Sequence, residues 1–197
     1  MTLGDFYFKE GRYRESAESY LRAIAYAPED APLHFVLADA LIALSDYHYA
    51  AFIIKKAVRL DSAMVFAEAD KRDFYGDDKI FAKHMAELEK YVADKPFDEA
   101  ALLTLGYNLK FSKQPEKAII TFEKVLKISP ENETAKLFLE ALRTKVDDGA
   151  KAGKKSLEKS PDSKAGKKPS TTASSARKAI TAPKTKPAKK INDSGDA

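Results

Sequence analysis

The sequence repeats itself with a period of 34 residues over most of its length. Four series of residues follow this step, and they read Gly4, Ala38, Arg72, Gly106; Ser16, Ala50, His84, Ala118; Tyr20, Ile54, Leu88, Phe122; and Pro28, Ser62, Pro96, Pro130. A fixed period of this length is typical of arrays in which each repeat is one supersecondary unit. We therefore expect stacked units rather than one layered domain.

Within each unit the apolar residues recur at helical spacing. Tyr20, Ala23 and Ile24 fall on one face of a helix, and Phe122 and Val125 do the same in a later unit. Gly11 suits a turn between two helices. The prolines at positions 28, 96 and 130 end the second helix of their units, because proline cannot continue a helix. The pattern predicts an all-α fold built from helical hairpins.

The best-preserved unit is LGDFYFKEGRYRESAESYLRAIAYAP, residues 3–28. It resembles the tetratricopeptide repeat at Leu3, Gly4, Tyr7, Gly11, Tyr13, Tyr20, Ala23 and Pro28. The resemblance implies an α-solenoid of about four helix-turn-helix repeats over residues 1–143. The expected units are 1–30, 31–64, 65–98 and 99–132, followed by a capping helix over 133–146. Met1 falls at the fifth position of the repeat, so either the first helix is short or the chain is cut from a longer one.

The third unit departs from this pattern. Lys71 and Arg72 replace a leucine and a small residue, and Gly76 should end its first helix early. A second helix over 80–93 keeps an apolar stripe. We expect a hairpin with a shortened or tilted first helix; the alternative is an irregular connection that splits the array.

The last part of the chain differs in composition from the rest. Residues 144–197 contain 14 Lys/Arg and 6 Asp/Glu, a net charge of +8, and no aromatic residue. Such a segment buries too little apolar surface to offset the entropy of ordering, so we expect a disordered tail over 147–197. A basic tail can bind nucleic-acid phosphates weakly and nonspecifically. The alternative is a solubilising linker.

Composition and motifs argue against catalysis and bound cofactors. The chain has no cysteine, which excludes disulfides, thiolate metal sites and cysteine nucleophiles. His34 and His48 fit packing and surface roles. His84 lies near Asp77 and Asp78 in sequence, but no fourth metal ligand accompanies them. We expect no enzyme activity, no catalytic residue, no cofactor and no metal site. The sequence shows neither a secretory signal nor an apolar run of ~18 residues. We therefore expect a cytoplasmic protein that does not enter a membrane.

The resemblance also implies a peptide-binding groove lined by the first helix of each hairpin. The groove residues that we predict are Phe35, Asp39, Ile42, Asp70, Asp73, Leu103, Tyr107, Lys110 and Phe111. Asp5, Asp39 and Asp73 share one repeat position, and stacking would place their carboxylates in a column. An acidic column beside apolar side chains would suit a peptide with basic and apolar residues. Asparagine stands at that position in family members that clamp a carboxylate, so such a clamp is not expected.

The predicted function is therefore that of a scaffold or adaptor that binds a protein or peptide partner. The alternative is nucleic-acid or anionic-surface association through the tail. The sequence sets neither the partner nor the oligomeric state.

Overall fold

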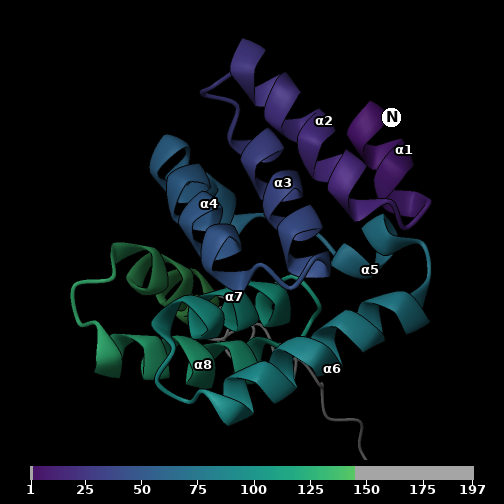
Figure 1. The fold of residues 1–197 in the computed structure, drawn as a ribbon. Helices are drawn as coiled ribbons and strands as arrows, with labels where there is room; N and C mark the ends of the chain where they lie inside the picture. Colours follow the sequence, from purple (N-terminus) through teal and green to yellow (C-terminus); the bar gives the residue numbers. More distant parts are fainter. Residues whose placement is uncertain (1, 145–197) are drawn as a thin grey trace, which may run out of the picture. The chain divides into compact units, whose positions relative to one another are not determined.

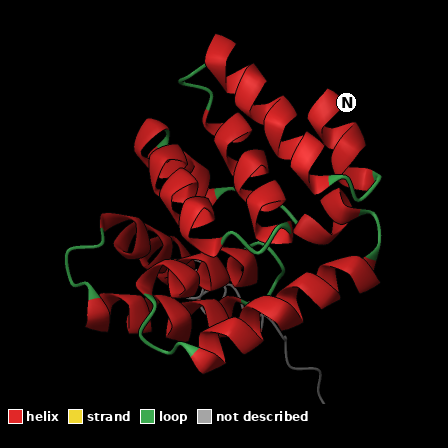
Figure 2. Ribbon diagram, viewed as in Figure 1, coloured by secondary structure: helices red, strands yellow, loops and turns green. Residues whose placement is uncertain are grey.

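The structure is a computed structural model that describes residues 2–144, and these residues lie within one compact unit. They form helices joined by short loops and turns, with no strand among them (Figures 1 and 2). The fold is all-α, as predicted. The elements are α1 (Leu3–Lys9), α2 (Tyr13–Tyr26), α3 (Ala31–Ala43), α4 (Tyr47–Leu60), η1 (Ser62–Phe66), α5 (Lys71–Tyr75), α6 (Asp78–Asp94), α7 (Glu99–Lys110) and α8 (Pro115–Ile128). Residues 133–144 form a further helix.

Aspartate side chains cap several helices at their first turn. Asp30, Asp46, Asp77 and Asp98 each accept a backbone N–H at the start of α3, α4, α6 and α7. Such caps satisfy donors that have no partner within the helix. The helix boundaries thus follow from local sequence as well as from packing.

The two helices of the outer hairpins approach closely at a glycine. A Cβ added at Gly4 of α1 would lie 2.4 Å from the ring of Tyr20, and one added at Gly106 of α7 would lie 2.7 Å from the ring of Phe122. In the second hairpin, the same pair of positions holds Ala38 and Ile54, both fully buried. A small residue opposite a large one therefore sets the spacing of the helices in these three hairpins.

The third unit does not follow this rule, because Arg72 stands where the small residue belongs. Its first helix, α5, has only five residues and ends at Gly76, whose φ of 72° starts the turn into α6. The helix is shortened, as expected. It also lies elsewhere than in a regular stack: α4 packs directly against α7, and α5 contacts α1 (Figure 1). The second and fourth units are thus neighbours in space.

Hydrogen bonds and ion pairs hold the contact between α4 and the start of α7. Lys55 Nζ lies 2.8 Å from Glu99 Oε1, and His48 Nε2 lies 2.8 Å from Asp98 Oδ2. The buried hydroxyl of Thr104 donates to the carbonyl oxygen of Tyr47 at 3.1 Å. These contacts are specific to the direct packing of the second unit on the fourth.

Helix α6 crosses the beginnings of α2 and α4. His84 packs edge-on against Tyr13, and Tyr91 packs edge-on against Tyr47. Tyr13 and Tyr47 are one repeat apart, and His84 and Tyr91 are two helical turns apart. Helix α6 therefore contacts the first residues of α2 and α4 through side chains on one of its faces.

The helix over 133–144 covers the exposed face of the fourth unit. Phe138 is fully buried and stacks on Phe122 with ring centroids 5.1 Å apart. Leu139 and Leu142 are also buried. The two last residues of the predicted capping helix and the predicted tail over 147–197 lie outside the described residues.

The weak local packing around α5 leads to a testable expectation. Backbone amides of residues 67–78 should exchange with solvent at least about tenfold faster than those of α7, because only Lys71 and Tyr75 of α5 are buried, whereas nine residues of α7 are. The amide of Lys71, which donates to Phe111 O at 2.8 Å, should be the exception. Hydrogen exchange followed by NMR measures this, and equal protection in the two segments would contradict it.

Candidate functional site

The nine predicted groove residues fall into two groups. Six are buried, with 8% exposure or less: Phe35, Asp39, Ile42, Leu103, Tyr107 and Phe111. The other three, Asp70, Asp73 and Lys110, line an open pocket. Phe35 and Tyr107 stack with ring centroids 5.6 Å apart, which brings α3 and α7 together. The structure thus places the predicted residues near one another, but it divides them between a buried centre and an open surface.

The buried centre is occupied by Lys71, the first residue of α5. Its ammonium group forms an ion pair with Asp39 and donates a hydrogen bond to Asn108 Oδ1 at 3.1 Å. It also lies 3.5 Å from the ring centroid of Tyr107. We call Asp39, Tyr107, Asn108 and the carbonyl group of Phe111 the Lys71 site. The side chains of Lys71 and Asp39 are only 6% and 8% exposed.

Burial acts against the charges of this pair. It raises the pKa of Asp39 and lowers the pKa of Lys71, because surroundings of low dielectric disfavour the charged form of each group. The attraction between the two groups acts in the opposite direction. The free-energy cost of removing water from two charged groups offsets most of the free energy gained from their attraction. Such a pair therefore fixes a geometry more than it adds stability.

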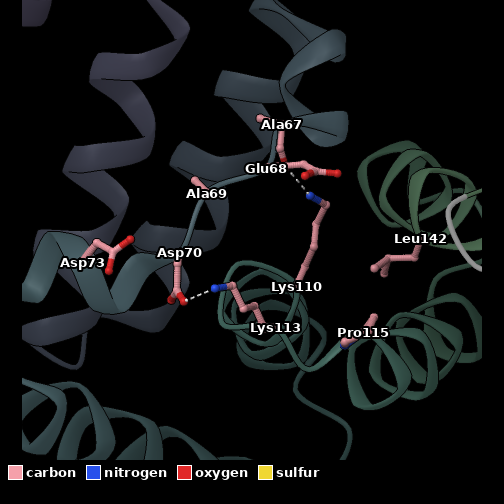
Figure 3. A pocket seen from close by; sticks show the side chains of 9 residues that line it. All are labelled: Ala67, Glu68, Ala69, Asp70, Asp73, Lys110, Lys113, Pro115 and Leu142. Atoms are coloured by element: carbon pink, nitrogen blue, oxygen red, sulfur yellow. Dashed lines mark hydrogen bonds and ion pairs between the residues drawn. The ribbon is translucent and has the colours of Figure 1, made fainter. Parts of the chain in front are cut away.

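The open pocket has a volume of about 600 Å³ (Figure 3), and its lining residues Asp70 and Lys110 are the sequence neighbours of Lys71 and Phe111. One wall is the segment from Ala67 to Asp73, with three acidic residues. The other comes from the end of α7, the turn into α8 and the helix over 133–144. The lining residues are Ala67, Glu68, Ala69, Asp70, Asp73, Lys110, Lys113, Pro115 and Leu142. The pocket therefore has an acidic wall facing a basic one.

Two contacts cross this pocket. Lys110 Nζ donates to the carbonyl oxygen of Ala67 at 3.0 Å, and Lys113 Nζ lies 3.1 Å from Asp70 Oδ2 (Figure 3). Hydrogen bonds from the Arg72 guanidinium and from Lys113 hold the pKa of Asp70 well below its usual range. Asp70 therefore stays charged at neutral pH, and the acidic wall keeps its charge.

The expected column of aspartates does not form. Asp5 belongs to the N-terminal capping box of α1, and its carboxylate accepts a hydrogen bond from the hydroxyl of Tyr20 at 2.7 Å. Asp39 is buried and forms an ion pair with Lys71, whereas Asp73 is exposed and lines the open pocket. The reason is that α5 does not stack between α4 and α7. The residue of the third unit that reaches Asp39 is thus a lysine.

Lys71 and Asn108 were not among the predicted site residues. A signal was present for Lys71, because a lysine replaces the leucine that the repeat carries at that position. A charged residue at an apolar position needs a buried partner or a changed backbone path, and here it has both. No comparable departure from the repeat pattern marked Asn108 in the sequence.

The remaining titratable groups do not suggest another chemistry. Among residues 2–144, no group of three His, Asp or Glu side chains could hold a metal ion. His34 is buried, with Nδ1 2.8 Å from Asp30 O, and the His48 side chain is 64% exposed. No helix of the described part of the chain is long and apolar enough to cross a membrane.

The burial of His84 predicts that the stability of the protein depends on pH. It is buried between Tyr13 and Tyr75, and burial lowers its pKa from the ordinary value of 6.5. The unfolded chain therefore binds a proton at a higher pH than the folded chain does. Stability should be constant above about pH 6.5 and should fall as the pH drops below it.

Thermal melts between pH 5 and pH 8 measure this effect. The variant His84→Phe keeps an aromatic ring between the two tyrosines but has no proton to gain, so its melting temperature should change less over this range. An equal change in both proteins would show that another group is responsible.

Comparisons with known proteins agree with the repeat architecture. The sequence model of the tetratricopeptide repeat matches residues 1–30 and 100–132. No curated protein matches the chain.

Several solved structures show similarity to the chain at low sequence identity. One is the second TPR domain of human RPAP3, solved by NMR in complex with the HSP70 peptide SGPTIEEVD, with 23% identity over 71% of this chain and 88% of that one and a TM-score of 0.33. Another is the MamA RS-1 ArsTM double mutant, with 22% identity over 79% and 88% and a TM-score of 0.34. A crystal structure of MamA has 18% identity over 77% and 98% and a TM-score of 0.32.

The two segments that match the repeat model contain the two hairpins in which a glycine packs against an aromatic ring. Sequence and structure thus identify the same two units. The chain therefore contains two segments, residues 1–30 and 100–132, that match the tetratricopeptide repeat.

Proposed function

We propose that this protein is an interaction module, a scaffold or adaptor, that binds a peptide or a helix of a partner protein at the open pocket. The observation that carries the proposal is the pair of oppositely charged walls, Asp70 and Asp73 on one side and Lys110 and Lys113 on the other. Such walls orient a charged peptide along the pocket. Leu142 and Pro115 add apolar surface. No catalytic role is proposed.

The proposal includes the division of the chain into four units of 34 residues or fewer and a helix that covers the last one. It also includes a cytoplasmic location, with which a chain that has no cysteine is compatible.

Charge reversal in the pocket tests the proposed function. The full chain is used to capture partners from a cell extract, and captured proteins are identified by mass spectrometry. Asp73→Lys and Lys113→Glu each reverse one wall, and both residues are exposed, so the fold should tolerate the changes. A specific partner should be lost from both variants.

Matched controls carry the same charge changes elsewhere. Asp94→Lys and Lys124→Glu alter exposed residues of α6 and α8 outside the pocket. A partner that both controls retain and both pocket variants lose supports the proposal. A partner retained equally by all four variants would show that the pocket is not the binding site.

A second candidate function is association with nucleic acid through the basic end of the chain. The observation that favours it is the net charge of +8 over residues 144–197, against −4 in the rest. Binding of this kind should weaken steeply between about 50 and 200 mM salt and should disappear when residues 145–197 are deleted. Peptide binding at the pocket should survive the same deletion.

A further inference from the structure

We propose that residues 67–76 are an internal ligand of the Lys71 site, and that a partner peptide displaces them with a lysine followed three or four residues later by an aromatic residue. The inference rests on the proposed function, because it specifies the chemistry of the partner and extends the binding surface from the open pocket into the buried centre beside it.

The contacts of Lys71 are those of a bound peptide residue. Its backbone N–H donates to Phe111 O at 2.8 Å, and its side chain reaches Asp39 and Asn108. These groups belong to α3, to α7 and to the residue that follows α7, so the site is complete without any other part of the third unit. A short segment occupies it through one main-chain hydrogen bond and one buried side chain.

A second anchor lies three and four residues further along. The ring of Phe74 packs against Phe8 of α1 with centroids 4.5 Å apart, and the ring of Tyr75 packs against the same residue at 4.8 Å. Arg72 and Asp73 between the anchors are not buried. The segment thus presents a lysine and an aromatic pair at helical spacing to two separate parts of the array.

Besides these two anchors, the segment is held by the contacts of Ala67 and Asp70 with Lys110 and Lys113 at the open pocket, and by the packing of Tyr75 against α6. Residues 67–70 have no regular secondary structure, and α5 has five residues, of which only Lys71 and Tyr75 are buried. Gly76, at positive φ, provides a turn on the other side. Few buried apolar contacts and a short helix are features of segments that open locally. The segment can therefore leave while the flanking helices remain in place.

The chemistry of the site selects the incoming ligand. A peptide without a cation would cover the Asp39 carboxylate and leave its negative charge without a cationic partner, which is strongly unfavourable. An incoming lysine makes the same contacts that Lys71 gives up. The tethered segment competes at a high effective concentration, so a free peptide binds the intact protein only weakly.

The experiment uses a labelled peptide copied from Ala67–Asp77 as the probe and the full chain as its receptor. Fluorescence anisotropy compares the wild type with Lys71→Ala, whose own segment has lost its cation. The variant should bind the peptide at least about tenfold more tightly than the wild type. Lys83→Ala, which removes an exposed lysine of α6, should behave like the wild type.

Two changes test the specificity of this binding. A peptide with alanine in place of its lysine should lose at least about tenfold in affinity for Lys71→Ala. The unchanged peptide should lose affinity to the same extent when Asp39→Asn is combined with Lys71→Ala. Equal binding by the wild type and Lys71→Ala, or binding that ignores the peptide lysine, would overturn the inference.

Circular dichroism confirms that each variant is folded before titration. If Lys71→Ala does not fold, Phe74→Ala decides instead, because it weakens the second anchor and leaves the buried ion pair intact; it should also bind the probe more tightly than the wild type. Capture of partners is not part of this test. A partner that the pocket variants and their controls retain equally would therefore count against the proposed function, whereas a probe that binds Lys71→Ala no more tightly than the wild type would count against the inference.

Discussion

Replacing Phe122 by alanine is expected to lower the free energy of unfolding by about 3–5 kcal/mol. Phe122 is fully buried, meets Gly106 of α7 on one side and stacks on Phe138 on the other. Its ring therefore joins both helices of the fourth unit to the helix over 133–144. Its removal leaves a cavity that three elements line, and rigid helices close such a cavity only in part.

Urea denaturation followed by circular dichroism measures this change. Phe97→Ala is the matched control, because Phe97 is 82% exposed in the turn before α7. Its effect should stay within about 0.5 kcal/mol. Similar losses in the two variants would show that Phe122 does not hold the fourth unit together.

Gly106→Ala is expected to destabilise the protein by about 1–3 kcal/mol. Alanine is favoured over glycine within a helix by ~1 kcal/mol, so the helix alone would predict a gain. The added Cβ would instead lie 2.7 Å from the Phe122 ring, which is held by its stacking on Phe138. A loss of stability would thus show that the close approach of α7 and α8 outweighs the helix propensity of alanine.

A double-mutant cycle assigns this cost to the contact. In a chain that already carries Phe122→Ala, the change Gly106→Ala should no longer destabilise, and the interaction energy should exceed about 1 kcal/mol. Gly4→Ala should behave like Gly106→Ala, because its Cβ would meet Tyr20, whose hydroxyl is held by Asp5. A cost that persists without the Phe122 ring would point to another cause.

The period of the sequence predicted the helices because each hairpin is a local structure. The positions of Gly4, Tyr20, Gly106 and Phe122 follow from the repeat, and the structure pairs them as the pattern indicates. The short first helix of the third unit was also predictable, because Gly76 ends it. These features depend on residues close together in the chain.

The path of the third unit could not be predicted in the same way. The even spacing of the repeat suggested that each unit stacks on the next, yet α4 packs on α7. Arg72 is unable to take the place of a small residue, and Lys71 finds a buried carboxylate in another unit. The binding roles of the predicted groove residues remain predictions, and six of the nine are buried within the fold.

The direct packing of α4 on α7 also bears on how the protein folds. In an array where each unit touches only its neighbours in sequence, folding can begin anywhere and spread along the chain. Here residues 61–98 must form a closed loop before α7 can dock, at an entropic cost of about 3 kcal/mol. We expect the N-terminal hairpins and the C-terminal helices to form as separate cooperative blocks whose docking limits the folding rate, as contacts distant in sequence do in other small proteins.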